Sequence, residues 1–217
     1  TKKKRPAPPS TVKQKQTTVE FGLNIPYTVK SNGEEYTIII EQGIMDAKYE
    51  YQCVPKLEES AYLNAKIANW TKYNLLSGEI NLYFEKTYIG KSQLDTSTPS
   101  DTLQISLGRD QNVQIQRTAI EEFRKRNFIG SKQVDSRAYR ISIRNNKAQP
   151  IDLQVVDQMP ISRDKDINVE QLEFSNGILN EETGKVTWKM NLKAGEETER
   201  IIAYEVKYPK GLYVLID

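Results

Sequence analysis

The sequence predicts an all-β protein made of two consecutive antiparallel β-sandwich-like domains, the second of them immunoglobulin-like. Apolar and polar residues alternate with a period of two, with interruptions, from Tyr27 to Tyr208. Turn-forming residues recur between the alternating runs, as at Asn32–Gly33 and Asn176–Gly177. A hydrophobic content of 37% over 217 residues is sufficient for genuine cores in one large or two small domains.

We divide the chain into a linker at residues 1–19, an N-terminal β domain at 20–108 and a C-terminal sandwich at 109–217. The first segment combines a basic cluster, three prolines and polar residues, which bury too little apolar surface to offset the entropy of ordering. We favour a solvated linker over a segment whose Lys2–Arg5 cluster touches a membrane or nucleic acid. The chain starts at Thr1, so we expect a processed product or an excised fragment with further domains upstream.

The charge distribution argues against a nucleic-acid partner. The chain has 31 basic and 29 acidic residues, and six of the basic ones lie in residues 1–19, which contain no acid. The remainder therefore carries 25 basic and 29 acidic residues, a net charge of −4. Such a body lacks the positive charge needed to neutralise many phosphates. There is also no apolar run long enough to span a bilayer and no signal-peptide apolar region.

The first domain is expected to contain two hairpins and three further strands. Residues 21–41 suit a hairpin whose turn is Asn32–Gly33. Residues 45–54 and 61–70 predict two strands, and residues 75–94 a second hairpin. A short strand over residues 103–107 leaves the first sheet at Gly108, where we place the domain boundary.

The second domain begins with an ambiguous segment. In residues 113–128 Val113, Ile115 and Arg117 alternate as in a strand, whereas Glu121 and Lys125 have the spacing of a helical ion pair. We favour a long strand that turns at residues 129–132 into the next one. Any helix is expected to be short, and residues 118–126 are where we most expect one.

The clearest pattern lies in residues 134–162, around which the chain is organised. Tyr139, Ile141 and Ile143 fall on one face, and Ile151, Leu153 and Val155 repeat the period after a turn at residues 145–150. We predict a central antiparallel hairpin. Strands at 169–174, 185–192 and 200–208 complete the sheet, with Trp188 in the core; Trp70 has more polar neighbours, so its burial is less certain.

Several catalytic chemistries are disfavoured. No histidine occurs, which removes His-based triads and His metal ligands. Cys53, the single cysteine, has no histidine to act as its base and is expected to be buried in a strand. Glu58 and Glu59 are neighbours that point to opposite faces of a strand, so we interpret them as exposed loop residues.

One acidic group is a candidate metal site. Asp157, Asp164 and Asp166 could suggest a hard-cation site, but the glycine of a calcium loop is missing because Val169 follows Asn168. We favour a solvated acidic loop. We therefore predict no catalytic residue, no bound cofactor and no metal, with these three aspartates as the candidates if a metal binds.

An ordered set of short segments resembles the carboxy-terminal domain of the mucoidy inhibitor A family, a bacterial group of uncharacterised function. The resemblance covers residues 21–211 and is carried by these segments: residues 78–92, 107–110, 141–161, 192–196 and 204–209. It implies a longer protein with an export signal, an amino-terminal domain and a coiled coil upstream, and a location in the periplasm or cell envelope. It supplies no catalytic motif.

These observations predict a non-enzymatic interaction or structural module of a cell-envelope protein. The partner is expected to be a protein or an envelope glycan. The alternative is a carbohydrate-binding module or a glycoside hydrolase, because two carboxylates can hydrolyse a glycoside without histidine. A cleft with two carboxylates beneath an exposed aromatic ring would favour the enzyme, and an apolar patch would favour a protein partner.

Overall fold

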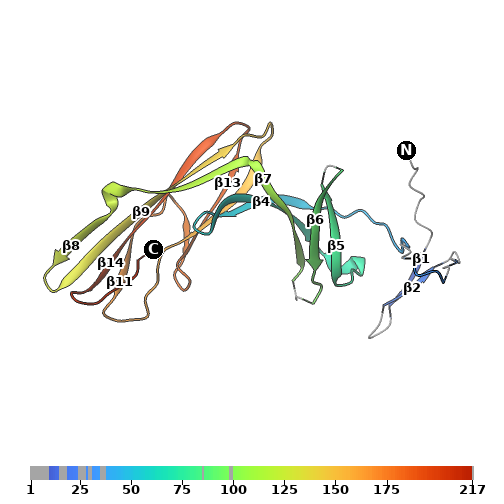
Figure 1. Ribbon diagram of the computed structural model, residues 1–217, viewed down its shortest axis with the longest axis horizontal. Helices are drawn as coiled ribbons and strands as arrows, with labels where there is room; N and C mark the ends of the chain where they lie inside the picture. Colours follow the sequence, from blue (N-terminus) through green and yellow to red (C-terminus); the bar gives the residue numbers. More distant parts are fainter. Residues whose placement is uncertain are drawn as a thin grey trace.

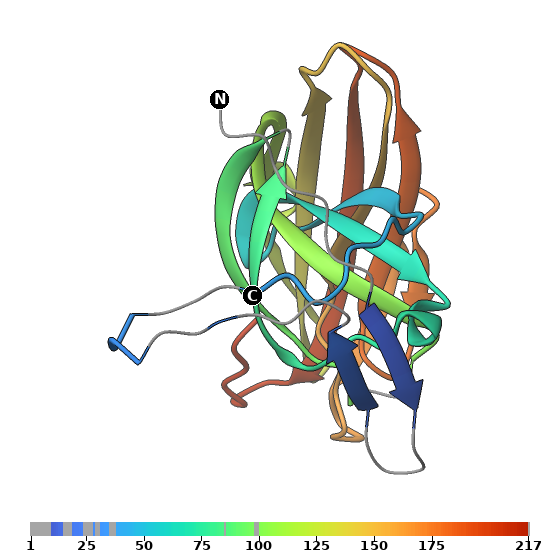
Figure 2. The ribbon, with the colours of Figure 1, turned by 90° about the vertical axis from the view of Figure 1, so that its right-hand side faces the viewer.

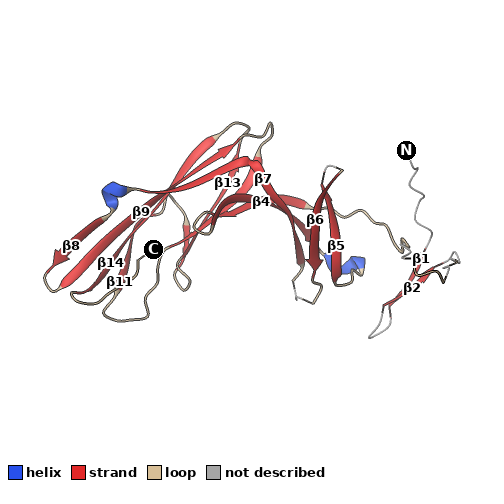
Figure 3. Ribbon diagram, viewed as in Figure 1, coloured by secondary structure: helices blue, strands red, loops and turns tan. Residues whose placement is uncertain are grey.

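The computed structural model describes residues 10–14, 19–23, 28, 31–34, 38–84, 86–97 and 100–216, and it is built from strands with two short helical turns (Figure 3). The all-β prediction is confirmed. The elements are β1 Ser10–Gln14, β2 Val19–Leu23, β3 Lys48–Val54, β4 Glu58–Ala68, η1 Trp70–Tyr73, β5 Gly78–Phe84, β6 Thr87–Leu94, β7 Thr102–Ala119, η2 Glu121–Phe123, β8 Lys125–Ile129, β9 Lys132–Asn145, β10 Ile151–Gln158, β11 Asn168–Glu173, β12 Ile178–Asn180, β13 Lys185–Leu192 and β14 Glu197–Pro209. Among the described helices, none has the length and apolar character to cross a membrane.

Ten strands form one sheet in the order β11-β14-β9-β7-β4-β3-β10-β13-β12, with β8 added beside β9. Figure 1 shows the long strands of this sheet. Buried side chains of β3, β4, β7, β9, β10, β13 and β14 form one apolar core. Members of this core include Ile141 and Ile143 of β9, Leu153 and Val155 of β10, and Trp188 of β13. The period-two pattern therefore predicted the buried faces correctly, because alternate strand residues point to opposite sides.

The predicted central hairpin is wrong in its pairing, although both of its strands exist. β9 pairs with β7, β8 and β14, whereas β10 pairs with β13 and β3. The turn at residues 145–150 therefore carries the chain across the core from β9 to β10, between which β7, β4 and β3 lie in the strand order. The buried amide of Asn145 donates to the carbonyl oxygens of Gln149, Leu192 and Lys193 at 3.0, 3.2 and 2.9 Å, and these bonds hold the crossing in place.

The pairing of β10 with β3 is parallel, with Leu153 opposite Tyr51 and Val155 opposite Cys53. This departs from the predicted antiparallel arrangement. It becomes possible because a long stretch of chain separates the two strands, which a tight hairpin turn could not provide.

The predicted boundary at Gly108 falls inside β7, which continues to Ala119. Gly108 adopts a φ of 91°, and the pairing of β4 with β7 shifts its register nearby. A glycine in this conformation produces a bulge and a bend rather than the end of a strand. β3 and β4 lie before the boundary, yet Cys53 and Leu63 belong to the same core as β9, β10 and β13. The immunoglobulin-like character of the second half stays a prediction.

Near the N-terminus the pairing also differs from the prediction. Residues 10–14, expected to be linker, form β1 and pair with β2. Residues 38–40, expected to be a strand, are not in one, and Tyr27, Val29, Tyr36 and Thr37 lie outside the described residues. The expected turn is seen at Gly33, where φ is 75°.

Other predictions are confirmed. β5 and β6 form the hairpin expected at residues 75–94. The ambiguous segment is strand up to Ala119 and then the short helical turn η2, and β8 turns into β9 at Gly130. Trp188 is buried, with 4% of its surface exposed, and donates its indole N–H to the Phe174 carbonyl oxygen at 2.7 Å.

Candidate functional site

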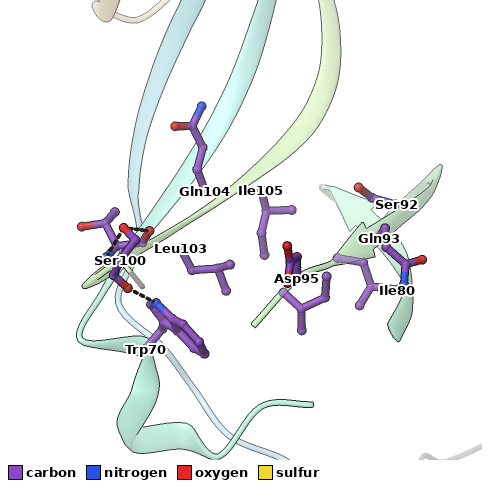
Figure 4. A pocket seen from close by; sticks show the side chains of 11 residues that line it. Trp70, Ile80, Ser92, Gln93, Asp95, Ser100, Leu103, Gln104 and Ile105 are labelled. Atoms are coloured by element: carbon purple, nitrogen blue, oxygen red, sulfur yellow. Dashed lines mark hydrogen bonds between the residues drawn. The ribbon is translucent and has the colours of Figure 1, made fainter. Parts of the chain in front are cut away.

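The β5–β6 hairpin lies beside the first residues of β7 (Figures 1 and 2). A groove opens between them. Its volume is about 300 Å³, at the lower end of the range for ligand sites. Figure 4 shows Trp70, Leu103 and Ile105 on one side and Ile80, Ser92 and Gln93 on the other. The groove therefore brings together residues from η1 and from three strands.

Trp70 anchors the floor of the groove. Its side chain is buried, and its indole N–H donates to the Ser100 carbonyl oxygen at 2.7 Å. Asn69 and Asn74 bracket η1 in left-handed conformations, with φ of 52° and 49°, and this tight turn directs Trp70 inward. Trp70 packs with Ile67, Leu94 and Leu103 in a second, smaller core. The burial of Trp70, which its polar sequence neighbours left open, follows from this turn.

The rim of the groove is polar. It consists of Ser92, Gln93, Asp95, Ser100, Thr102 and Gln104. Asp95 is the one acidic side chain among the described residues that line the groove, and its Oδ1 accepts hydrogen bonds from Ser97 N and Oγ at 2.8 and 2.6 Å. Glycoside hydrolysis ordinarily uses a pair of carboxylates.

Asp157, one of the three candidate aspartates, is fully buried in the core. Its Oδ2 accepts from Nε of Arg117 at 2.8 Å, which joins β10 to β7. The Arg117 guanidinium also lies 3.5 Å from the ring centroid of Tyr139. Arg117 lies on the same inward face of β7 as Val113 and Ile115. Its buried charge is therefore paired with that of Asp157 on β10.

Cys53 lies in the same region, as predicted. Burial, together with the charge of Asp157, raises the pKa of the Cys53 thiol to about 12. A thiol that stays protonated at neutral pH is a poor nucleophile. The cysteine therefore serves as a packing residue.

Asp164 and Asp166 lie apart from Asp157, in the exposed loop after β10. Oδ1 of Asp164 accepts from the backbone N–H of Asp166 at 2.9 Å, which closes a local turn. In the part of the chain that the structure describes, no group of three or more acidic or cysteine side chains could hold a metal ion. The loop interpretation is thus compatible with the geometry.

Glu58 and Glu59 serve separate contacts. Glu58 accepts from the Tyr62 hydroxyl at 2.6 Å and pairs with Arg109, while Glu59 accepts from the backbone N–H of Arg117 at 2.7 Å. Both lie in β4 rather than in a loop, because the strand begins at Glu58.

A second ionic cluster, which the sequence did not reveal, joins β3, β7 and the loop after β9. Oδ2 of Asp110 accepts from the Tyr51 hydroxyl at 2.7 Å and from Nζ of Lys147 at 2.6 Å. These two donors outweigh burial and lower the pKa of the Asp110 carboxyl to about 2. Burial and the hydrogen bond to Asp110 raise the pKa of Tyr51 to about 12. Residues so far apart in sequence give no local signal of this contact.

A third cluster centres on the buried Asp135. Its carboxylate accepts from Arg126 at 3.0 Å, from Gln133 at 3.2 Å and from the hydroxyl of Tyr208. Although burial opposes ionisation, these donors lower the pKa of the Asp135 carboxyl. Each buried carboxylate thus binds protein donors.

Comparison with known proteins places this region in a family. A family model described as a domain of unknown function, DUF4139, matches residues 2–210. A curated relative, "Protein F37C4.5" of Caenorhabditis elegans, is 22% identical over 215 residues, which cover 92% of this chain and 38% of the relative. The chain therefore spans less than half the length of that relative.

Proposed function

We propose that this chain, which belongs to the DUF4139 family of domains of unknown function, is a non-enzymatic interaction module. Its site is the groove between the β5–β6 hairpin and β7, and its ligand is an extended polypeptide segment with an apolar anchor side chain. The observation that carries this proposal is the apolar floor beneath a polar rim.

The floor suits an aliphatic or aromatic side chain of a peptide. Leu103 is buried, and Ile80 and Ile105 are half-buried, so they retain surface that a ligand can cover. Trp70 has only 7% of its surface exposed. A sugar ring would stack on an open aromatic face, which Trp70 does not offer.

The edge of β7 suits a peptide backbone. Residues 102–105 pair with residues 65–68 of β4 on one side, and the described strands provide no partner for their other side. An extended peptide can bind such an edge through main-chain hydrogen bonds while its side chains enter the groove. The polar rim then satisfies polar groups that the peptide brings with it.

The chemistry-bearing side chains support a binding role because they are engaged with one another. Asp157 pairs with Arg117, Asp110 with Lys147, and Asp135 with Arg126, all away from the groove lining. Their hydrogen-bond donors lower the pKa of the Asp110 and Asp135 carboxyls, so these two groups are poor proton donors near neutral pH.

We also propose that the protein belongs to the bacterial cell envelope. The support is the resemblance of residues 21–211 to the mucoidy inhibitor A family, whose members carry an export signal. The relative from Caenorhabditis elegans is an animal protein, so a similar sequence also occurs outside bacteria. Fractionation of cells producing the full-length protein tests the location.

The binding proposal is tested with peptides selected from a random-sequence display library. Their affinity is measured by fluorescence polarisation for the unaltered chain, for Ile105→Glu and for Ile178→Glu, which changes an exposed residue of β12. A buried charge in the floor should weaken binding at least tenfold, since it costs desolvation energy. Ile178→Glu should bind as the unaltered chain does.

Soluble peptidoglycan fragments and envelope oligosaccharides form the second arm of the test. Binding of an oligosaccharide that Ile105→Glu abolishes would replace the peptide proposal by a carbohydrate-binding one. Turnover of a glycoside that is lost on Asp95→Asn would overturn the non-enzymatic proposal. Melting temperatures of Ile105→Glu and Asp95→Asn establish whether each variant retains the fold.

A further inference from the structure

We propose that the turn between β8 and β9 is a membrane-contacting tip that binds anionic lipid headgroups and inserts two apolar side chains. This goes beyond the proposed peptide groove and uses a different surface. Figure 1 shows the β8–β9 turn at one extreme of the long axis of the molecule, with the β5–β6 hairpin well away from it.

The tip presents apolar side chains to solvent. Phe128 and Ile129 have 61% and 65% of their surfaces exposed, although they stand next to each other at the turn. The turn continues through Gly130, whose φ of 58° favours glycine. Ser131 accepts a hydrogen bond from the backbone N–H of Lys210 at 3.1 Å, so the turn after β14 lies beside it.

Basic side chains surround these apolar residues. Residues 124–132 contain four Lys or Arg residues and no acidic residue, within a body whose net charge is negative. Lys210 adds a fifth, and its Nζ lies 5.0 Å from the ring centroid of Phe128. Arg126 is paired with Asp135, and Arg124 with Glu121 at 3.7 Å, whereas the described residues give no ion pair to Lys125, Lys132 or Lys210.

The shape of the tip favours a lipid surface over an acidic protein. Phe128 and Ile129 lie on a protruding turn, so a protein partner would need a matching pocket, whereas a bilayer deforms around an inserted side chain. Apolar residues with a collar of Lys and Arg match the interface between acyl chains and anionic headgroups. A basic residue near such a surface contributes about fivefold in affinity.

The test is sedimentation of the 217-residue chain with vesicles of phosphatidylcholine alone or mixed with phosphatidylglycerol. Binding should require phosphatidylglycerol and weaken with salt. The double variant Phe128→Ser and Ile129→Ser should reduce partitioning at least tenfold. Lys125→Gln and Lys132→Gln should each reduce it about fivefold.

Matched controls change similar residues elsewhere. Ile178→Ser removes an exposed isoleucine of β12, and Lys189→Gln removes an exposed lysine of β13; neither should alter partitioning. Residues 2–5 are also basic, so a variant with all four replaced by Gln separates their contribution from that of the tip. In that variant the tip substitutions should keep their effect.

A fluorescent reporter distinguishes insertion from surface adsorption. Phe128→Trp should show a blue-shifted emission and quenching by brominated acyl chains only with anionic vesicles. Partitioning that is unaffected by the tip variants, or a Trp emission that does not shift, would overturn the proposal. A third outcome would assign the patch to an acidic protein instead. In that case the chain binds soluble polyglutamate as well as it binds vesicles, polyglutamate displaces it from vesicles, and the Trp emission does not shift.

Discussion

Replacing Asn145 by Asp perturbs the crossing between β9 and β10 without changing side-chain volume. The Asn145 side-chain N–H groups donate to three backbone carbonyl oxygens at 2.9 to 3.2 Å, while Oδ1 accepts from the backbone N–H of Lys147 at 3.0 Å. In Asn145→Asp the acceptor remains, but a second carboxyl oxygen takes the place of the amide donor. That oxygen then faces carbonyl oxygens inside the core.

The loss of stability caused by Asn145→Asp depends on pH, and the hydrogen-bond partners of residue 145 decide the direction of this dependence. The new carboxyl can donate one hydrogen bond while it is protonated, so burial and the facing carbonyls raise its pKa above the unfolded value of about 3.9. The deficit relative to the unaltered chain is therefore small below that value, about 1 to 2 kcal/mol. It grows as the pH rises through the raised pKa and reaches about 3 to 5 kcal/mol, the cost of an uncompensated buried charge.

Urea unfolding of the unaltered chain, Asn145→Asp and Asn145→Ala at pH about 3.5 and about 7.5 measures the small and the large deficit. Asn145→Ala loses the same donors without gaining a charge, so its deficit should stay nearly constant with pH. A difference in free energy of unfolding of less than about 0.5 kcal/mol between Asn145→Asp and the unaltered chain at pH about 7.5 would refute the role of the amide donor, because a neutral surface substitution has that effect. The same pH dependence in both variants would refute the buried charge.

Further predictions concern the core and the ionic clusters. Trp188→Ala should lower the free energy of unfolding by about 3 to 5 kcal/mol, and an unchanged melting temperature would contradict this. Gly177→Ala should also destabilise, because a Cβ there would lie 2.6 Å from the Trp188 indole nitrogen; calorimetry measures the loss. The pKa of Asp110 is lowered to about 2, so its contribution to the free energy of unfolding is complete above the unfolded pKa of about 3.9 and is lost as the pH falls towards 2. In Asp110→Asn the free energy of unfolding should therefore depend less on pH in that range. Cys53, with its thiol pKa raised to about 12, should react with a thiol reagent only after unfolding, and rapid labelling of the native chain would refute its burial.

The candidate groove could not be predicted from the sequence. Its floor combines Trp70, Ile80 and Leu103, which belong to different elements, and its rim residues are ordinary polar side chains. The clusters around Asp110 and Asp157 are equally invisible, because Tyr51, Asp110 and Lys147 are far apart in the chain. Such contacts depend on which strands become neighbours, and no spacing in the sequence records that.

The sequence by itself determined the class of fold, most strands and their buried faces. A strand with one face in the core must alternate apolar and polar residues, so the spacing of Ile141, Ile143 and Trp188 was enough to place them in the core. Only the tertiary structure decided which strands pair: β9 and β10 separate across the core, and β3 joins β10 in parallel. The physical reason is that strands pair through backbone hydrogen bonds, which are alike for every residue, while apolar faces of similar shape are interchangeable until the whole core is packed.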